Sequence, residues 1–146
     1  MTTSDNRNAF NGFNQQLMAH LRANEGQVTS GPFAGRPLVI LSTVGARSKQ
    51  PHETPLVYTK DGDRYVVIAS KGGAPTNPSW YHNLLADPVV TLEVLGERFQ
   101  ARARAAEGEE RDRLYRKQAE KMPAFADYQR KTKRKIPVVV LERIPG

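Results

Sequence analysis

Hydrophobic and polar positions divide the chain into segments typical of strands and segments typical of helices. Short apolar runs and clean apolar–polar alternation predict strands. They cover six segments: residues 37–44, 52–59, 65–69, 89–95, 98–105 and 136–141. In the fifth segment Arg98, Gln100, Arg102 and Arg104 alternate with apolar residues, so we expect that strand to have one solvent-exposed face.

Helical spacing is clearest near the N-terminus. Phe10, Phe13, Leu17 and Leu21 recur at helical intervals and predict an amphipathic helix over about residues 10–24. Further helices are predicted from Asn77-Pro78 onward, over 107–122 and over 124–131.

The predicted strands are joined mainly by hairpin turns. Lys60-Asp61-Gly62-Asp63 is such a turn, and its glycine suits the positive φ that a tight hairpin needs. Pro55 has no N–H to donate, so it belongs at a sheet edge, a bulge or a strand end. The pattern therefore favours a mostly antiparallel sheet or a small barrel with flanking helices. Residues 1–8 are polar and predict a disordered N-terminus, and residues 9–146 predict a single domain.

Composition narrows the chemistry. The chain has no cysteine, which excludes thiol nucleophiles, disulfides and cysteine-ligated metals, and its three histidines show no close ligand spacing, so no metal site is expected. No apolar run approaches the roughly 20 residues of a membrane span, and no signal peptide is recognisable, so we expect a cytoplasmic location. The net charge of +7 favours an anionic partner: a phosphorylated cofactor, nucleic acid or an anionic membrane. A solvated basic surface would give the same charge.

Residues 66–83, VVIASKGGAPTNPSWYHN, are the first candidate site. Two glycines after Lys71 allow a backbone nest for an anion, beside that residue's ammonium group. Asn77 as N-cap and Pro78 at the first helical position would aim a helix N-terminus at the same region. With Trp80 and its neighbours, the stretch suits a planar, phosphorylated molecule. The alternative is a plain turn and a helix that buries Trp80 and Leu84.

A second candidate is the turn between the first two strands. It gathers Arg47, Ser48 and Lys49, which could contact an anion, although an exposed basic turn is the commoner case. The densest basic run, Arg130–Lys135, has no interleaved aromatic residues, so nucleic acid is not the expected partner.

Four stretches give the chain a family resemblance: STVGARSKQPHETPLVY, ASKGGAPTNPSWYHNLLADP, FADYQ and the closing IPVVVL. Through them the chain resembles the deazaflavin-dependent nitroreductase family, whose members use coenzyme F420. The resemblance implies a six-stranded split β-barrel of the FMN-binding type with flanking helices. It also implies an oxidoreductase (nitroreductase or quinone reductase type) that transfers a hydride from the reduced 8-hydroxy-5-deazaflavin to quinones, nitro compounds or similar small electrophiles.

The resemblance also implies site residues. The cofactor contacts fall on Ala46, Arg47, Ser48, Lys49, His52, Thr54, Pro55, Leu56, Val57, Ile68, Ala69, Ser70, Lys71, Ser79, Trp80, Tyr81, His82 and Asn83. The substrate side falls on Met122, Phe125 and Tyr128, whose alternative role is core packing under a terminal helix. No catalytic side chain is assigned, because the cofactor carries the hydride chemistry.

Three alternatives stay open at this point. A related split-barrel reductase could use FMN. A module without turnover could bind deazaflavin or nucleic acid. Peripheral contact with an anionic membrane, through the basic run and the helix over 10–24, could bring the protein to membrane quinones.

Overall fold

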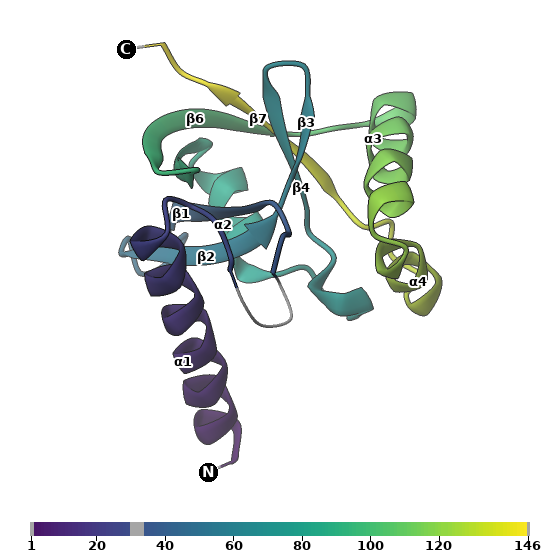
Figure 1. Cartoon of the computed structure of the whole chain (residues 1–146). Coiled ribbons are helices and arrows are strands. Elements are labelled where there is room, and N and C mark those ends of the chain that lie inside the picture. Colours follow the sequence, from purple (N-terminus) through teal and green to yellow (C-terminus); the bar gives the residue numbers. More distant parts are fainter. Residues whose placement is uncertain (1, 30–33, 146) are drawn as a thin grey trace.

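The computed structural model describes residues 2–29 and 34–145, with side chains described from Gly12 onward. Within these residues seven antiparallel strands form one sheet, in the order β2-β1-β5-β6-β7-β4-β3 (Figure 1). The strands are β1 Leu38–Val44, β2 Pro51–Val57, β3 Thr59–Asp61, β4 Arg64–Ile68, β5 Val89–Val94, β6 Glu97–Ala105 and β7 Val138–Arg143.

The sheet curls back on itself because two consecutive strands lie at its opposite edges. Only Tyr58 separates β2 from β3, yet β2 pairs with β1 and β3 pairs with β4. The Tyr58 N–H donates to the Pro37 carbonyl at 3.1 Å, which fixes the crossing point. The result is a curled antiparallel half-barrel with helices around it.

The prediction of six strands is therefore wrong in number, because the segment 52–59 continues as a seventh strand after Tyr58. Leu56, Val57, Tyr58 and Thr59 form an uninterrupted strand-like run, so nothing local marks the residue where the chain changes partners. Two finer expectations are confirmed. Pro55 lies on an edge strand, and β6 buries Phe99, Ala101 and Ala103 on one face only.

Four α-helices and a short 3-10 turn surround the described sheet: α1 Thr2–Ala23, η1 Lys71–Gly73, α2 Ser79–Ala86, α3 Gly108–Lys121 and α4 Ala124–Lys131. The predictions for α3 and α4 are confirmed to within about a residue. The α1 helix ends at Ala23, within a residue of the predicted end, and the disordered segment expected over residues 1–8 stays a prediction.

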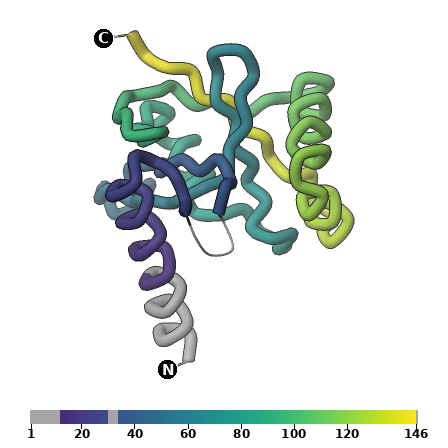
Figure 2. The backbone as a smooth tube through the Cα atoms, in the orientation of Figure 1, coloured from purple at the N-terminus to yellow at the C-terminus, as the bar shows by residue number. Residues whose placement is uncertain are grey.

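Apolar side chains form three clusters. The inner face of the curled sheet packs around Leu41, Val67 and Leu92, and α2 closes this cluster with Trp80 and Leu84. The α3 and α4 helices pack on β4 and β7 through the second cluster, and α1 packs on β1 through the third. Figure 2 shows α3 and α4 together at one side of the sheet, away from α1. Each fully buried Leu or Val contributes about 1.5–3 kcal/mol of transfer free energy.

Arginine–carboxylate pairs fasten the β3–β4 hairpin and β6 to α3. Arg113 donates to Asp61 at 3.1 Å, and Arg64 also pairs with Asp61. Arg104 donates to Glu110 at 2.7 Å, and Arg64 reaches the same carboxylate at 3.2 Å. These contacts hold the pKa of Asp61 well below its usual range, chiefly through Arg113, and lower the pKa of Glu110 to about 2, chiefly through Arg104.

Candidate cofactor-binding site

Three adjoining cavities follow the edge strand β2, and together we call them the β2 groove. The first, ≈ 600 Å³, lies between the turn after β1 and α2. The second, ≈ 580 Å³, lies between β2 and residues 77–83 and shares four lining residues with the first: His52, Ser79, His82 and Asn83. The third, ≈ 220 Å³, lies beyond it toward Phe125 and shares Asn14, Pro55 and Leu56 with the second. The shared walls make the groove continuous.

The first cavity has an exposed cation. Arg47 lies on the turn after β1 and takes part in no hydrogen bond or ion pair with the described residues. The turn itself is ordered, because the Gly45 N–H donates to the Gln50 carbonyl at 2.8 Å. Ser48 Oγ lies 3.3 Å from Nε2 of His52, which ties the turn to β2. This end of the groove suits an anionic group.

Lys71 brings a second cation, and part of the backbone beside it is already hydrogen-bonded within the loop. The loop makes a tight 3-10 turn in which the Gly73 and Ala74 N–H groups donate to the Ser70 and Lys71 carbonyls, at 2.9 and 3.1 Å. Those two N–H groups are therefore not available to a ligand. The Lys71 ammonium donates to Thr76 Oγ1 at 3.1 Å and is exposed at the second cavity.

The predicted start of α2 is also corrected. The helix begins at Ser79, with Pro78 as its cap residue and no capping side chain. The Asn77 side chain instead accepts a hydrogen bond from Arg134 at 2.7 Å. Trp80 is only 6% exposed and packs with Leu84 in the core, as in the alternative interpretation of this stretch. It also forms part of the groove wall.

Arg134 is the site residue that sequence reasoning missed. Its guanidinium donates to the Ala69, Ser70 and Ala74 carbonyls at 3.2, 2.8 and 2.8 Å and so supports the whole loop that carries Lys71. In the sequence it lies within the basic run Arg130–Lys135, which is considered there only as a contact for nucleic acid or an anionic membrane. No local signal separated it from its neighbours.

The far end of the groove is apolar. Leu17, Leu38, Ile68 and Phe125 contribute to the third cavity, together with Phe13 of α1. Of the three residues assigned to the substrate side, only Phe125 reaches the groove.

Met122 and Tyr128 pack against the second apolar cluster instead, and Met122 Sδ accepts a hydrogen bond from Gln118 at 3.7 Å. The two side chains therefore pack in the core, which is the alternative given for them from the sequence.

Most of the predicted cofactor residues line the β2 groove. Those that do are Ala46, Arg47, Ser48, His52, Thr54, Pro55, Leu56, Val57, Ile68, Lys71, Ser79, Trp80, His82 and Asn83. Four lie off its walls: Lys49, Ala69, Ser70 and Tyr81.

Each of these four has another role. Lys49 Nζ donates to the Ala46 carbonyl at 3.1 Å, and Ala69 is completely buried. The Ser70 carbonyl accepts from Arg134, and the Tyr81 ring packs edge-on against Trp80, with 6.5 Å between the ring centroids.

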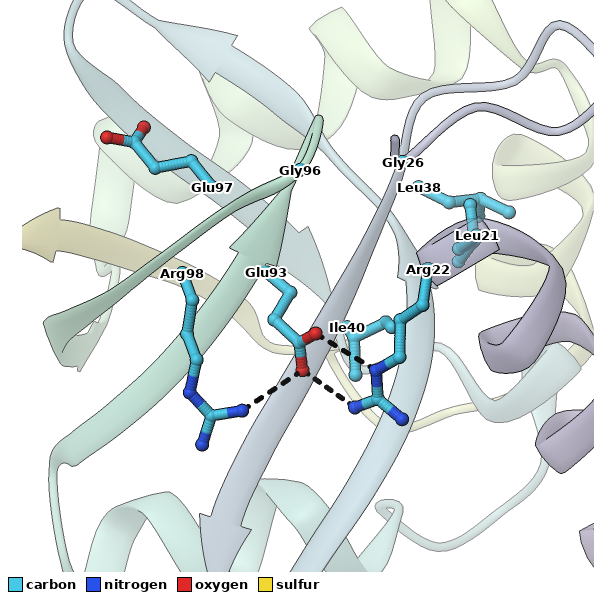
Figure 3. A pocket seen from close by; sticks show the side chains of 9 residues that line it. All are labelled: Leu21, Arg22, Gly26, Leu38, Ile40, Glu93, Gly96, Glu97 and Arg98. Carbon is cyan, nitrogen blue, oxygen red and sulfur yellow. Dashed lines mark hydrogen bonds and ion pairs between the residues drawn. The ribbon is translucent and has the colours of Figure 1, made fainter. Parts of the chain in front are cut away.

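The α1 helix is fixed beside the groove by Arg22. The guanidinium of Arg22 donates to both carboxylate oxygens of Glu93, at 3.0 and 2.7 Å, and Arg98 lies on the other side of that carboxylate (Figure 3). The same guanidinium reaches Glu53 of β2 at 2.5 Å. The cavity next to Arg22, ≈ 150 Å³, is lined by none of the predicted site residues in the described part of the chain.

The described residues hold neither a metal-binding cluster nor a membrane-spanning helix. No group of three or more histidine, aspartate or glutamate side chains is arranged to hold a metal ion among them. Within the same residues, no helix combines the length and the apolar character that a membrane span requires.

The curled sheet and the groove along its edge define a cofactor-binding half-barrel, and comparison with known proteins agrees with this class. The sequence model of the F420H(2)-dependent quinone reductase family matches residues 14–143. An F420H(2)-dependent quinone reductase of Mycobacterium tuberculosis is 40% identical over 125 residues, which are 84% of each chain.

Two solved structures are also similar. One, described as an F420-H2 dependent reductase, has a TM-score of 0.68 and 40% identity and covers 73% of this chain and 95% of its own. The other, described as a domain-swapped dimer, has a TM-score of 0.69 and 31% identity and covers 97% of this chain and 100% of its own.

The chain belongs to the F420H(2)-dependent quinone reductase family. It is thus an oxidoreductase whose cofactor is coenzyme F420, and both predictions are confirmed.

Proposed function

We propose that the protein reduces quinones with reduced coenzyme F420 bound in the β2 groove. The observation that carries the proposal is the polarity of the groove: Arg47 and Lys71 lie toward one end, and an apolar cavity at Phe125 forms the other. A phosphate-bearing deazaflavin has the same division into an anionic part and a flat ring system.

The residues present fit the cofactor. The Arg47 and Lys71 cations would hold its anionic groups, since charge-assisted contacts of this kind are the strong ones. The β2 backbone from Thr54 to Val57 has an unpaired outer edge, which offers N–H and carbonyl groups to the edge of a ring. Ile68 gives that region an apolar wall.

When bound, reduced F420 supplies the hydride. The side chains bind, orient and exclude water, and none is proposed as a general acid, so water is the proposed proton source. Phe125 and Leu17 would form the wall against which a flat quinone packs. Nitro compounds are a second class of proposed acceptor.

We further infer that residues 9–146 form one split-barrel domain. The inference is supported by the pairing of strands between Leu38 and Arg143 into one sheet that curls at Tyr58. The cytoplasmic location stays a prediction.

Membrane contact through the basic run also stays a prediction, and several of its charges have other partners. Arg134 faces the Lys71 loop, Arg130 pairs with Asp127, and Lys135 Nζ lies 3.6 Å from a carboxylate oxygen of Asp112.

An anaerobic assay tests the function. Reduced F420 is mixed with the protein and a soluble quinone, and the return of oxidised deazaflavin absorbance is followed. We expect oxidation that requires both protein and quinone, and no comparable binding of FMN in a parallel titration. Tight binding of FMN, or binding of F420 without turnover by any quinone or nitro compound, would instead support one of the alternatives.

A further inference from the structure

The Arg134 guanidinium is surrounded by neutral acceptors from a distant segment. It donates to the carbonyls of Ala69, Ser70 and Ala74 and to the Asn77 side chain, at distances between 2.7 and 3.2 Å. These four acceptors span the loop on both sides of Lys71. One side chain thus adds four hydrogen bonds to the two backbone bonds of the 3-10 turn.

No carboxylate neutralises this cation among the residues that the structure describes. Arg64, Arg104 and Arg113 all pair with acidic side chains, whereas Arg134 has only carbonyl and amide partners. Burial lowers its pKa, but an arginine stays protonated. Two positive charges therefore lie at the loop, that of Lys71 within it and that of Arg134 beside it, and the Arg134 guanidinium already donates to the loop's carbonyls.

Arg134 is itself held from the other side. Its carbonyl accepts from Gln129 Nε2 at 2.8 Å, and Gln129 Oε1 accepts from Arg111 of α3 at 2.7 Å. The loop also contacts α4 directly at Gly73, where a Cβ atom would lie 2.9 Å from the Tyr128 carbonyl oxygen. The Lys71 loop is thereby fixed to the α3–α4 layer at two independent points.

We propose that Arg134 is a positioning residue for cofactor binding: it fixes the 69–77 loop so that the Lys71 ammonium is presented to the anionic part of the cofactor. The inference rests on the proposed role of Lys71 in the β2 groove. It assigns a specific role to one member of a basic run whose other charges face solvent or nearby acids.

A double-mutant cycle tests this coupling. Fluorescence titration with F420 is applied to wild type, Lys71→Ala, Arg134→Gln and the double variant. A positioning role predicts that Arg134→Gln raises the Kd about tenfold in the wild-type background, as expected for loss of a contact worth about 1.4 kcal/mol. It predicts a change under about threefold when Lys71 is already absent, because coupled residues are not additive. Equal fold-changes in both backgrounds would overturn the proposal.

Two further variants separate positioning from charge and from stability. Arg134→Lys keeps the charge but cannot reach four acceptors, so its Kd should still rise several-fold; a wild-type Kd would overturn the proposal. Lys133→Gln, one residue away, removes an exposed charge and should leave the Kd unchanged.

Amide hydrogen exchange over residues 69–77 reports on the loop without ligand and should be faster in both Arg134 variants. If wild type binds no F420, the proposed function fails by itself, and unchanged exchange would then overturn the positioning role separately. If wild type binds F420 but Lys71→Ala leaves the Kd unchanged, the positioning role is overturned and the function stands.

Discussion

The Asn83 side chain on α2 accepts a hydrogen bond from the Ala46 N–H at 3.0 Å, so the helix and the turn that form the first cavity are fixed to each other. The same carboxamide donates from Nδ2 to Thr43 Oγ1 at 3.2 Å. Asn83 is only 7% exposed, and Thr43 2%. The groove wall is therefore held by a buried polar group, and Asn83 shapes the site in addition to lining it.

Replacing Asn83 should loosen this wall. Asn83→Ala leaves the Ala46 N–H and the Thr43 hydroxyl without a partner, and an unsatisfied buried group costs about 1–3 kcal/mol. We expect a lower melting temperature together with weaker F420 binding. Leu85→Ala, on the same helix at a position that is 55% exposed, is the control and should change neither. An unchanged melting temperature in Asn83→Ala would show that water satisfies both groups.

Lys71 should be a principal anchor of the cofactor. A charge-assisted contact is worth about 1.5–3 kcal/mol, so Lys71→Ala should raise the Kd for F420 roughly tenfold or more. Lys71→Arg should recover only part of the loss, because a guanidinium does not replace a compact ammonium. Fluorescence titration at low and high salt measures both.

Lys133→Ala is the matched control for Lys71→Ala. It also removes one exposed lysine charge, but from outside the groove. Equal losses of affinity in the two variants would mean that overall charge, and not the loop, holds the cofactor.

The sequence predicted those parts of the fold and site that depend on local patterns. The spacing of apolar residues located most strands and helices. Pro55 indicated an edge strand because a residue without an N–H cannot donate a hydrogen bond to a neighbouring strand. The strand exchange at Tyr58 could not be predicted, because it depends on which distant strands pair with each side of one residue. Arg134 was missed for the same reason: its loop acceptors lie between 57 and 65 residues away in the sequence. The sequence predicts Asn77 as the cap of α2, but its side-chain oxygen accepts a hydrogen bond from Arg134, which lies outside the segment.

Acid should weaken the attachment of the β3–β4 hairpin and of β6 to α3. The folded pKa of Glu110 is lowered to about 2, so its contribution to the free energy of unfolding is complete above the unfolded pKa of about 4.3 and is lost as the pH falls toward 2. Asp61, with a pKa shifted in the same direction, acts likewise. Urea unfolding at several pH values between 7 and 3 should show stability decreasing below about pH 5.

Glu110→Gln should reduce that pH dependence, and Glu109→Gln, at an exposed neighbouring position, should not. Because Glu110 is partly exposed, added salt should also reduce the effect. The same pH dependence in all three proteins would place the acid-sensitive contacts elsewhere.

Removing residues 1–8 should leave folding and F420 binding intact. The segment is polar, and the apolar residues that fix α1 to the sheet, Met18 and Leu21, lie far beyond it. Thermal unfolding and cofactor titration of the truncated chain measure both properties. A loss of several degrees in melting temperature would show that the first turns of α1 contribute to stability.

Quinones should be better electron acceptors than bicyclic nitroimidazoles. The apolar end of the groove presents Phe125, Leu17 and Ile68, which offer packing surface but no hydroxyl to orient a nitro group. The measured quantity is the ratio of kcat/KM for the two classes with reduced F420. Phe125→Leu removes aromatic surface from the wall. It should raise the KM for quinones by more than a general loss of stability, measured as a lower melting temperature, would explain. Met122→Leu conserves volume at a position that packs on the second apolar cluster, so the ratio should not change. Faster turnover of nitroimidazoles by wild type would show that the groove orients them without a hydroxyl from these positions.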